Sequence, residues 1–462
     1  MGTASSIQHT SKQALFNVSK AVKKIAGFSE GRRNRLPRNQ PRPPRDEDSC
    51  GGNDEKYKIG NEDGVVCRTQ HSHIRNATMG KVGQTMSKKA SAQKLEDAVT
   101  EFIEKLGNDE KLEQAKLQLI RSPSFDVWKC KREELVSYIM LMFGDLGITN
   151  ELDISYNKLK KWLVAVEQNY ITDVYFHNFR HAFCVTQMMY FMIHELKLMK
   201  YMTTLQLTIL LVACICHDLD HPGLNNLYQE KAHTELSVLY HNCSPLEHHH
   251  CAVAFQLLSA NDLNIFGNLE QTQFDEVSHI VIQLILATDM SIHDQILDDF
   301  HQKLEEGFSF DKPEHLLALQ KILIKCCDIS NEVRPLETSK VWVDRLFAEF
   351  FSQADRERRE GLPVEVFMQQ TKVKKANDQL AFIRKIILPL FERLGRVFPD
   401  VNGRILRSLH ESELFYERLS HDEIGQLLTD DVTQQNNKKH VTFRKLEIPK
   451  VVVSDCSSER AI

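Results

Sequence analysis

A helical spacing of apolar residues that continues through most of the chain is the feature that most restricts its fold. Between about residues 108 and 425, apolar side chains recur at intervals of three and four, whereas the alternation of β-strands and Asn-Gly hairpin turns is absent. The sequence therefore predicts an all-α fold, a compact domain of many packed helices. The segments with this spacing are 131–146, 157–169, 181–199, 203–217, 248–259, 274–288, 313–330, 341–359 and 373–398.

The two ends of the chain differ from this helical region in composition. Residues 1–45 hold ten lysines and arginines against one acidic residue, and the last thirty or so residues are polar. Ordered structure is expected to begin near Leu95, where an apolar stripe of helical spacing starts. We therefore predict four regions, listed in chain order: a basic head at 1–45, a flexible linker at 46–94, a helical domain at 95–430 with its core at 108–425, and a disordered tail at 431–462.

Charge and cysteine content limit the ligand class and the compartment. Beyond residue 45 the chain carries 48 basic against 62 acidic residues, which argues against nucleic acid as a partner. The eleven cysteines are scattered and odd in number, as expected for free thiols in a reducing compartment. The apolar run 207–216 is about half the ~20 residues that span a bilayer. We expect a cytoplasmic protein that does not bind nucleic acid.

Four separated segments place histidine or aspartate in or beside an apolar helix. They read FHNFRHAF, CHDLDHPG, LEHHHCAVAF with LATDM, and KILIKCCDIS. In the first, His177 and His181 have the i,i+4 spacing of one helical face. Any one of these histidines is most simply a packed or surface side chain. Several buried carboxylates, however, need a compensating charge, and imidazole with carboxylate suits zinc or a similar ion. Together the segments predict a metal site.

These motifs resemble those of a known family. The order His181, His217-Asp218, Asp328 is similar to that of the HD superfamily of metal-dependent phosphohydrolases. The fuller strings HNFRH, HDLDHPG, LATDM and CDISNEVRP resemble the class I 3′,5′-cyclic nucleotide phosphodiesterases over residues 108–425, and most of all their cGMP-specific ninth family. The resemblance implies hydrolysis of a cyclic nucleotide, cGMP favoured, to the 5′-nucleoside monophosphate, which lowers second-messenger signalling.

The resemblance also implies roles for individual residues. A first metal ion, Zn²⁺, is expected on His181, His217, Asp218 and Asp328. A second ion, Mg²⁺ or Mn²⁺, is expected on Asp218 and on waters held by His221, Glu247 and Thr288. The general acid is expected to be His177, oriented by Glu349. The base pocket is expected to consist of Gln379, Phe382, Leu346 and Asn331.

Other readings of the same residues stay open. From helical spacing alone, Gln379 is a surface residue, and Phe350 stands where the ninth family is expected to have a pocket tyrosine. A dual-specificity or cAMP-preferring enzyme is therefore an alternative. A generic HD-type nucleotide phosphohydrolase and a catalytically silent nucleotide-binding regulator are further alternatives. A generic HD-type phosphohydrolase does not need the HNFRH motif or Gln379, so their presence argues against it. A catalytically silent regulator would have lost a metal ligand or the general acid, whereas this sequence has all of them.

The two ends carry short motifs of their own. The N-terminus MGTASS matches the myristoylation pattern at Gly2, and the basic residues that follow supply a second membrane signal. The predicted alternatives are peripheral membrane contact and, through GRRNRLPR, nuclear import. Residues 439–443 fit the K-x-V-x-F pattern that docks onto protein phosphatase 1, a pattern that often arises by chance. A homodimer is left open.

Overall fold

The computed structural model describes residues 112–369 and 375–435. These residues form α-helices, short 3-10 helices and one π-helical turn, and no β-strand occurs among them. The all-α prediction is confirmed. The predictions made for Gly2, for the head and linker at 1–94 and for the motif at 439–443 lie outside the described residues.

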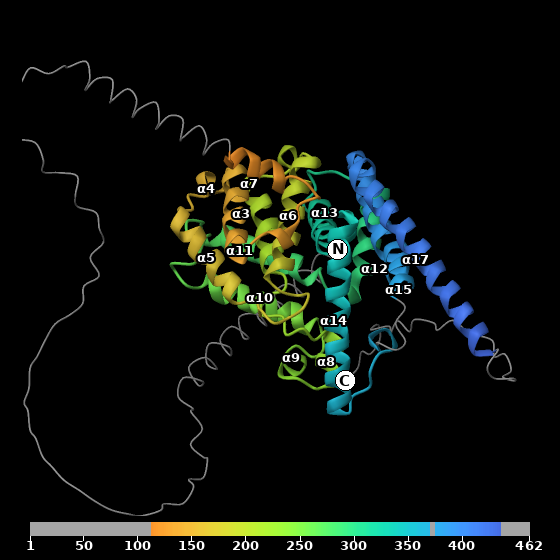
Figure 1. The fold of residues 1–462 in the computed structure, drawn as a ribbon. Helices are drawn as coiled ribbons and strands as arrows, with labels where there is room; N and C mark the ends of the chain where they lie inside the picture. The colour runs from red at the N-terminus through yellow and green to blue at the C-terminus, as the bar shows by residue number, and fades with distance from the viewer. Residues whose placement is uncertain (1–111, 370–374, 436–462) are drawn as a thin grey trace, which may run out of the picture. The chain divides into compact units, whose positions relative to one another are not determined.

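The helices follow one another with short connections (Figure 1). After a helical segment at 112–120, the α-helices are α3 (Arg132–Asp145), α4 (Ile148–Glu151), α5 (Tyr156–Gln168), α6 (Phe179–Glu195), α7 (Thr204–Cys216), α8 (Asn226–Lys231), α9 (Glu235–Leu239), α10 (Pro245–Leu258), α11 (Gln271–Leu286), α12 (His293–Glu305), α13 (Pro313–Asp328), α14 (Leu336–Glu360), α15 (Lys375–Phe382), α16 (Leu388–Val397) and α17 (Arg404–Gln435). The short helices are η1 (Val127–Lys129), η2 (Leu198–Lys200), η3 (Met290–Ile292), η4 (Ser330–Val333), η5 (Val366–Met368), the π-helical η6 (Ile383–Ile387) and η7 (Pro399–Asn402).

Each predicted segment coincides with helix, but several boundaries differ. The last predicted segment is divided into α15, η6 and α16, because Pro389 has no N–H to continue the regular hydrogen-bond pattern. Helices α12 and α17 were not among the predicted segments. The last of these continues to Gln435, so residues 431–435, which were assigned to the disordered tail, are helical.

Helix α7 lies in the core and explains the long apolar run. All its residues from Leu207 to Cys216 are buried, and it packs against α6, α11 and α13. Thr203 accepts a hydrogen bond from the N–H of Gln206 and so caps the start of the helix. A helix that is apolar on every side is stable only when other helices surround it. Its last residue therefore delivers whatever follows it into the interior.

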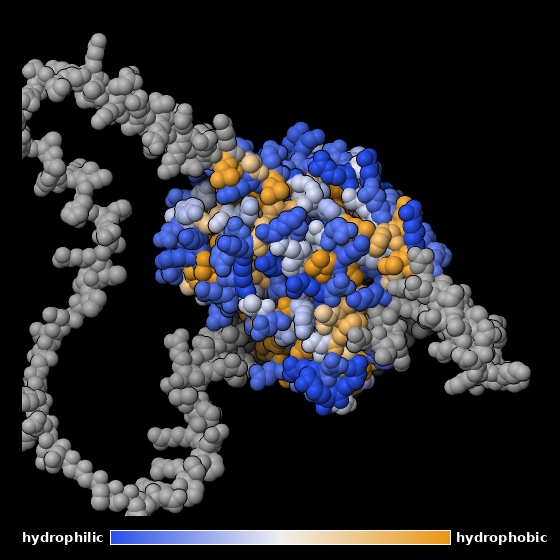
Figure 2. All heavy atoms as spheres, in the orientation of Figure 1, coloured by the Kyte–Doolittle hydropathy of each residue, from blue (hydrophilic) through white to orange (hydrophobic). Residues whose placement is uncertain are grey.

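The packing of the helices brings the start of α6 and the C-terminal ends of α7 and α13 together. In Figure 1, α3, α4 and α5 lie on one side of the described helices and α12, α15 and α17 on the other, with α6 and α13 between them. Helix α13 packs against both α6 and α7. The face seen in Figure 2 is largely hydrophilic, with apolar side chains in scattered patches.

A membrane span was not predicted for the helical region. Among the described residues, no single helix is both long and apolar enough to cross a membrane; α11 and Met290–Glu305 meet that requirement of length and composition only as a pair bent by 86°.

Candidate active site

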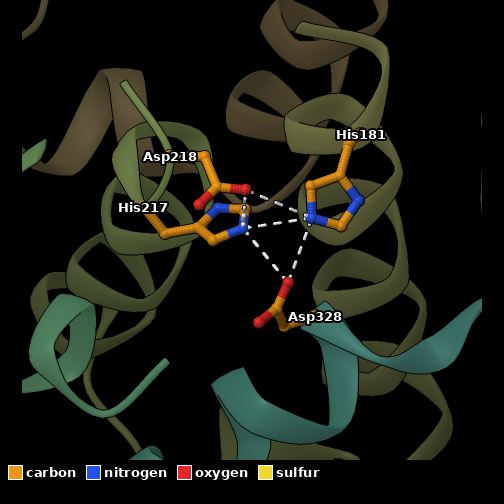
Figure 3. A group of neighbouring side chains, drawn as sticks. All are labelled: His181, His217, Asp218 and Asp328. Carbon is orange, nitrogen blue, oxygen red and sulfur yellow. Dashed lines mark hydrogen bonds and ion pairs between the residues drawn. The ribbon is translucent and has the colours of Figure 1, made fainter. Parts of the chain in front are cut away.

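Four predicted metal ligands converge from three helices. His181 lies in the first turn of α6, which Asn178 caps through the N–H of Arg180. His217 and Asp218 follow the buried α7, and Asp328 is the last residue of α13. Figure 3 shows the four side chains pointing toward one common region. His181 and Asp328 are 147 positions apart in the chain. They are neighbours because His181 lies in the first turn of one packed helix and Asp328 is the last residue of another.

The spacing of their ligand atoms fits one metal ion. The ligand atoms of all four side chains lie within 4.8 Å of one another. The His181 Nε2 is 3.0 Å from the Asp328 Oδ1 and 3.3 Å from the His217 Nε2, and the His217 Nε2 is 3.0 Å from the Asp218 Oδ2. Metal–ligand bonds of the zinc type place neighbouring ligands about 3.3 Å apart in a tetrahedron and about 2.9 Å apart in an octahedron. The donor set and its spacing therefore fit such an ion.

The hydrogen bonds around His217 give an independent reason for a cation. Its Nδ1 lies 2.9 Å from the carbonyl of Cys214, which can only accept, so the Nδ1 carries the proton. In its neutral form the ring directs the Nε2 lone pair at carboxylate oxygens, so a proton or a metal ion has to lie between them. Burial alone would lower the pKa of His217, but the charges of Asp218 and Asp328 outweigh burial and raise it well above the usual range. A shared metal ion removes this conflict between lone pairs.

A tight turn after Asp218 brings His221 back over the site. Asp220 and Gly223 adopt positive φ angles of 59° and 70°, which aspartate tolerates better than most residues and glycine adopts freely. Asp220 itself points to His249, whose Nε2 is 2.9 Å from its carboxylate, so it takes no part in the metal group. The turn stacks the His221 ring on that of His177, with centroids 4.2 Å apart.

His177 is held by a carboxylate from α14. Its Nδ1 lies 2.5 Å from the Glu349 Oε1, while the Glu349 Oε2 accepts hydrogen bonds from the N–H groups of Phe176 and His177. Burial would lower the pKa of His177, but the charge and hydrogen bond of Glu349 raise it to about 9. The expected common helical face with His181 is wrong, because α6 begins only at Phe179. The ring nevertheless lies beside the metal group.

A second group of ligand atoms surrounds the other side of Asp218. The side chains of Asp218, His221 and His250 place ligand atoms within 4.8 Å of one another, and the His250 Nε2 is 3.8 Å from the Asp218 Oδ1. Glu247, one turn earlier on α10, and Thr288, just after α11, are also buried. Burial, with the charge of Asp289 added, raises the pKa of Glu247 to about 8.

The predicted base-pocket residues lie on η4, α14 and α15. Gln379 is buried, which overturns the alternative that it is a surface residue, and its Nε2 donates to the Glu332 Oε1 at 2.9 Å. Asn331 precedes Glu332 in η4, and Leu346 and Phe382 are half-buried at the edge of the core. Lys375 pairs with Asp344 and ties α15 to α14. Phe350 is half-buried and has edge contacts with Phe347 and Phe367.

Sequence reasoning missed two residues in these surroundings. His250 sits in the HHH run that the sequence displays, and its spacing of three from Glu247 places both on one face of a helix. Glu332 lies inside CDISNEVRP and is buried to 2% exposure. A buried glutamate needs a hydrogen-bond donor, and Gln379, 47 positions later, is that donor. No local pattern predicts this pair.

Comparison with known proteins gives one consistent result. Residues 176–407 match the model of the family described as 3′5′-cyclic nucleotide phosphodiesterase. The chain is 46% identical to the mouse high affinity cGMP-specific 3′,5′-cyclic phosphodiesterase 9A over 70% of this chain and 59% of the relative, and equally identical to the human protein of that name over 53% of the latter. It thus spans less than two thirds of the length of these relatives.

A solved structure gives the same result for the fold. The phosphodiesterase domain of the RhoPDE fusion protein from the choanoflagellate Salpingoeca rosetta superposes with a TM-score of 0.63 at 27% identity, over 66% of this chain and 97% of that domain.

Proposed function

Because the chain belongs to the 3′5′-cyclic nucleotide phosphodiesterase family, we propose that it hydrolyses a 3′,5′-cyclic nucleotide, cGMP in preference to cAMP, to the 5′-nucleoside monophosphate. The observation that carries this proposal is the convergence of His181, His217, Asp218 and Asp328 on one point beside His177. Metal ions on such a ligand set can activate water and stabilise the phosphate, and a nearby proton donor can assist the leaving oxygen.

The residues divide into two metal-binding groups. His181, His217, Asp218 and Asp328 would hold the first ion, for which Zn²⁺ suits the imidazole and carboxylate donors. Asp218 also faces the second group, where Mg²⁺ or Mn²⁺ would be held largely through waters. When bound, such ions lower the pKa of a water and offset the charge of the phosphate. The second group consists of His221, Glu247, His250 and Thr288.

His177 is suited to protonate the leaving oxygen. The O3′ alkoxide is a poor leaving group unless it receives a proton as the P–O3′ bond breaks. Glu349 holds the Nδ1 of His177, so the protonated ring keeps its Nε2–H available for another acceptor. His221 does not compete for that role, because burial and the nearby charge of His177 lower its pKa well below the usual range.

This assignment predicts the alkaline limit of activity. The pKa of His177 is raised to about 9, so the acid is protonated at neutral pH and loses its proton as pH rises through that value. Bound metal ions add positive charge, so we expect kcat/KM for cGMP to fall at or somewhat below pH 9. The Glu349→Gln variant lacks the negative charge that raises the pKa of His177. The fall of its kcat/KM should therefore occur at a lower pH. If kcat/KM falls at the same alkaline pH in the parent and in Glu349→Gln, the assignment of His177 as the acid is contradicted.

The base pocket supports a purine substrate. The carboxylate of Glu332 accepts from the Nε2 of Gln379, which fixes the orientation of the amide and leaves its carbonyl oxygen for another donor. A purine edge that offers both a donor and an acceptor complements an amide held in this way, as guanine does at N1 and O6 and adenine at N6 and N1. The proposed preference for cGMP is supported by the cGMP specificity for which the mouse and human relatives are named.

Removal of the glutamine should weaken binding and leave the metals in place. We expect Gln379→Ala to raise KM for cGMP roughly tenfold or more, because a lost hydrogen bond to the base is worth about 1.5 kcal/mol or more once a partner is left unpaired. The zinc content should equal that of the parent. A matched control is Gln302→Ala, since Gln302 lies on the exposed side of α12 and bonds only within its helix. An unchanged KM in Gln379→Ala would place the pocket elsewhere.

The proposed selectivity is tested by the ratio of kcat/KM for cGMP to that for cAMP. A ratio well above one supports the cGMP preference, and a ratio near or below one favours the dual-specificity or cAMP-preferring alternative. Phe350→Tyr, measured in parallel, tests whether the missing hydroxyl at this position limits guanine selectivity. The location of the protein in the cell and its contacts with membranes or other proteins stay predictions from the sequence.

A further inference from the structure

Lys325 is a buried lysine that the roles given above do not use. It lies on α13 one turn before Asp328, and its side chain is only 2% exposed. Among the residues whose burial the structure describes, it is the only lysine that is buried. A buried ammonium group is costly unless its hydrogen bonds are satisfied, so its partners identify its role.

The partners of Lys325 are main-chain carbonyls from another helix end. Its Nζ donates to the carbonyl of Ala287 at 3.0 Å and to that of Asp289 at 3.4 Å, and lies 3.8 Å from the sulfur of Met290. Helix α11 ends at Leu286, and carbonyls at the end of a helix have no partner within it. Lys325 therefore closes the C-terminal end of α11 from outside, where a positive charge is also favourable.

The segment that Lys325 holds carries a residue of the second metal group. Thr288 lies between the two carbonyls that bind the Nζ, so its position depends on theirs. Asp289 continues the chain of contacts, because its Oδ2 accepts a hydrogen bond of 2.6 Å from the hydroxyl of Ser244. Ser244 is the N-cap residue directly before α10, and Glu247 lies in the first turn of that helix. One lysine thus connects the ends of α13, α11 and α10.

We propose that Lys325 is a positioning residue for the second metal site: it fixes Thr288 directly, and Glu247 through Asp289 and Ser244, where these side chains can hold the waters of a hydrated divalent ion. This inference rests on the proposed function. The charge of Lys325 would by itself weaken the binding of a cation. A positioning role and a purely electrostatic role therefore predict opposite effects when the lysine is removed.

The test uses binding of Mn²⁺ and needs no substrate. Lys325→Met keeps most of the length of the side chain and removes its donors and charge. The Mn²⁺ concentration that half-saturates the site is measured for zinc-loaded protein from the electron paramagnetic resonance signal of free Mn²⁺, and zinc per chain is determined by mass spectrometry. We expect unchanged zinc content and a rise of roughly tenfold or more in the half-saturating Mn²⁺ concentration, the usual size of an effect on residues behind a metal site.

The matched control is Lys321→Met. Lys321 lies one turn earlier on the same helix, is half-buried and faces Asp299 rather than the end of α11, so its loss should leave the half-saturating Mn²⁺ concentration unchanged. Ser244→Ala removes only the hydroxyl that bonds Asp289 and should also raise that concentration, by a smaller factor. If Lys325→Met does not fold, the Ser244→Ala variant decides whether these contacts position the second metal site.

Three results would overturn the proposal. The first two are a half-saturating Mn²⁺ concentration in Lys325→Met that equals that of the parent, or one that is lower. The third applies if Lys325→Met does not fold: a half-saturating Mn²⁺ concentration in Ser244→Ala that equals that of the parent. Failure of the proposed function is separate, because it would appear as a parent protein that does not hydrolyse cGMP whatever the Mn²⁺ titrations give.

Discussion

Asp328→Ala is expected to abolish hydrolysis and to strip the first metal ion from the protein. Asp328 contributes a carboxylate 3.0 Å from the His181 Nε2 and 3.2 Å from the His217 Nε2, so its removal leaves one side of the ligand group open. It also removes a negative charge that offsets the ion. Because the ion would supply both the activated water and the charge that neutralises the phosphate, turnover should fall to background. Zinc per chain and cGMP turnover are measured on the same sample.

A second aspartate of the sequence motif serves as the control for Asp328. Asp220 belongs to the same HDLDH string as the ligand Asp218, but it pairs with His249. Asp220→Asn retains a residue that tolerates a positive φ and should keep both zinc and turnover near the parent values. Full zinc content with parent-like turnover in Asp328→Ala would remove this residue from the metal group.

His177→Ala is expected to lower kcat by roughly 10²–10⁴, the usual contribution of general acid catalysis. Zinc content and KM should stay close to those of the parent, since the proposed function makes the ring a proton donor, held by Glu349, and not a ligand of the first ion. The measurements are kcat, KM and zinc per chain. A loss of zinc in this variant would instead assign His177 to the metal group.

A change in the leaving group separates acid catalysis from a structural effect of the His177 substitution. An analogue of cGMP in which sulfur replaces the bridging 3′ oxygen has a leaving group that needs no proton. We expect His177→Ala to recover most of the parent rate on that analogue. An equal loss of rate on both substrates would contradict the role of His177 as the acid.

The sequence predicted the parts of the site that depend on local pattern. The apolar run of α7 required a buried helix, and the residues after it, His217 and Asp218, therefore had to lie inside the domain. The same reasoning placed Asp328 at the inner end of α13. The resemblance then assigned these residues to one group, and their measured spacing fits a metal ion.

Contacts between distant segments were beyond such reasoning. Within KILIKCCDIS, Lys325 resembles a lysine on the outer face of an amphipathic helix, and only the packing of α13 on the end of α11 shows that it is buried. The pairing of Glu332 with Gln379 likewise depends on how η4 meets α15. His177 was wrongly placed on one helical face with His181, because Asn178, which has an extended backbone, separates His177 from α6. The helices α12 and α17 were omitted from the segments identified by periodicity.

Hydrolysis of cGMP in water enriched in ¹⁸O, with and without a chelator, tests the central claim most directly. We expect 5′-GMP as the product, with one ¹⁸O on its phosphorus, because water attacks phosphorus as the bond to O3′ breaks. We also expect that stripping the metals with a chelator stops the reaction and that adding back Zn²⁺ with Mg²⁺ or Mn²⁺ restores it. Formation of 3′-GMP, or a rate unchanged in protein from which all bound metal has been removed, would contradict the account.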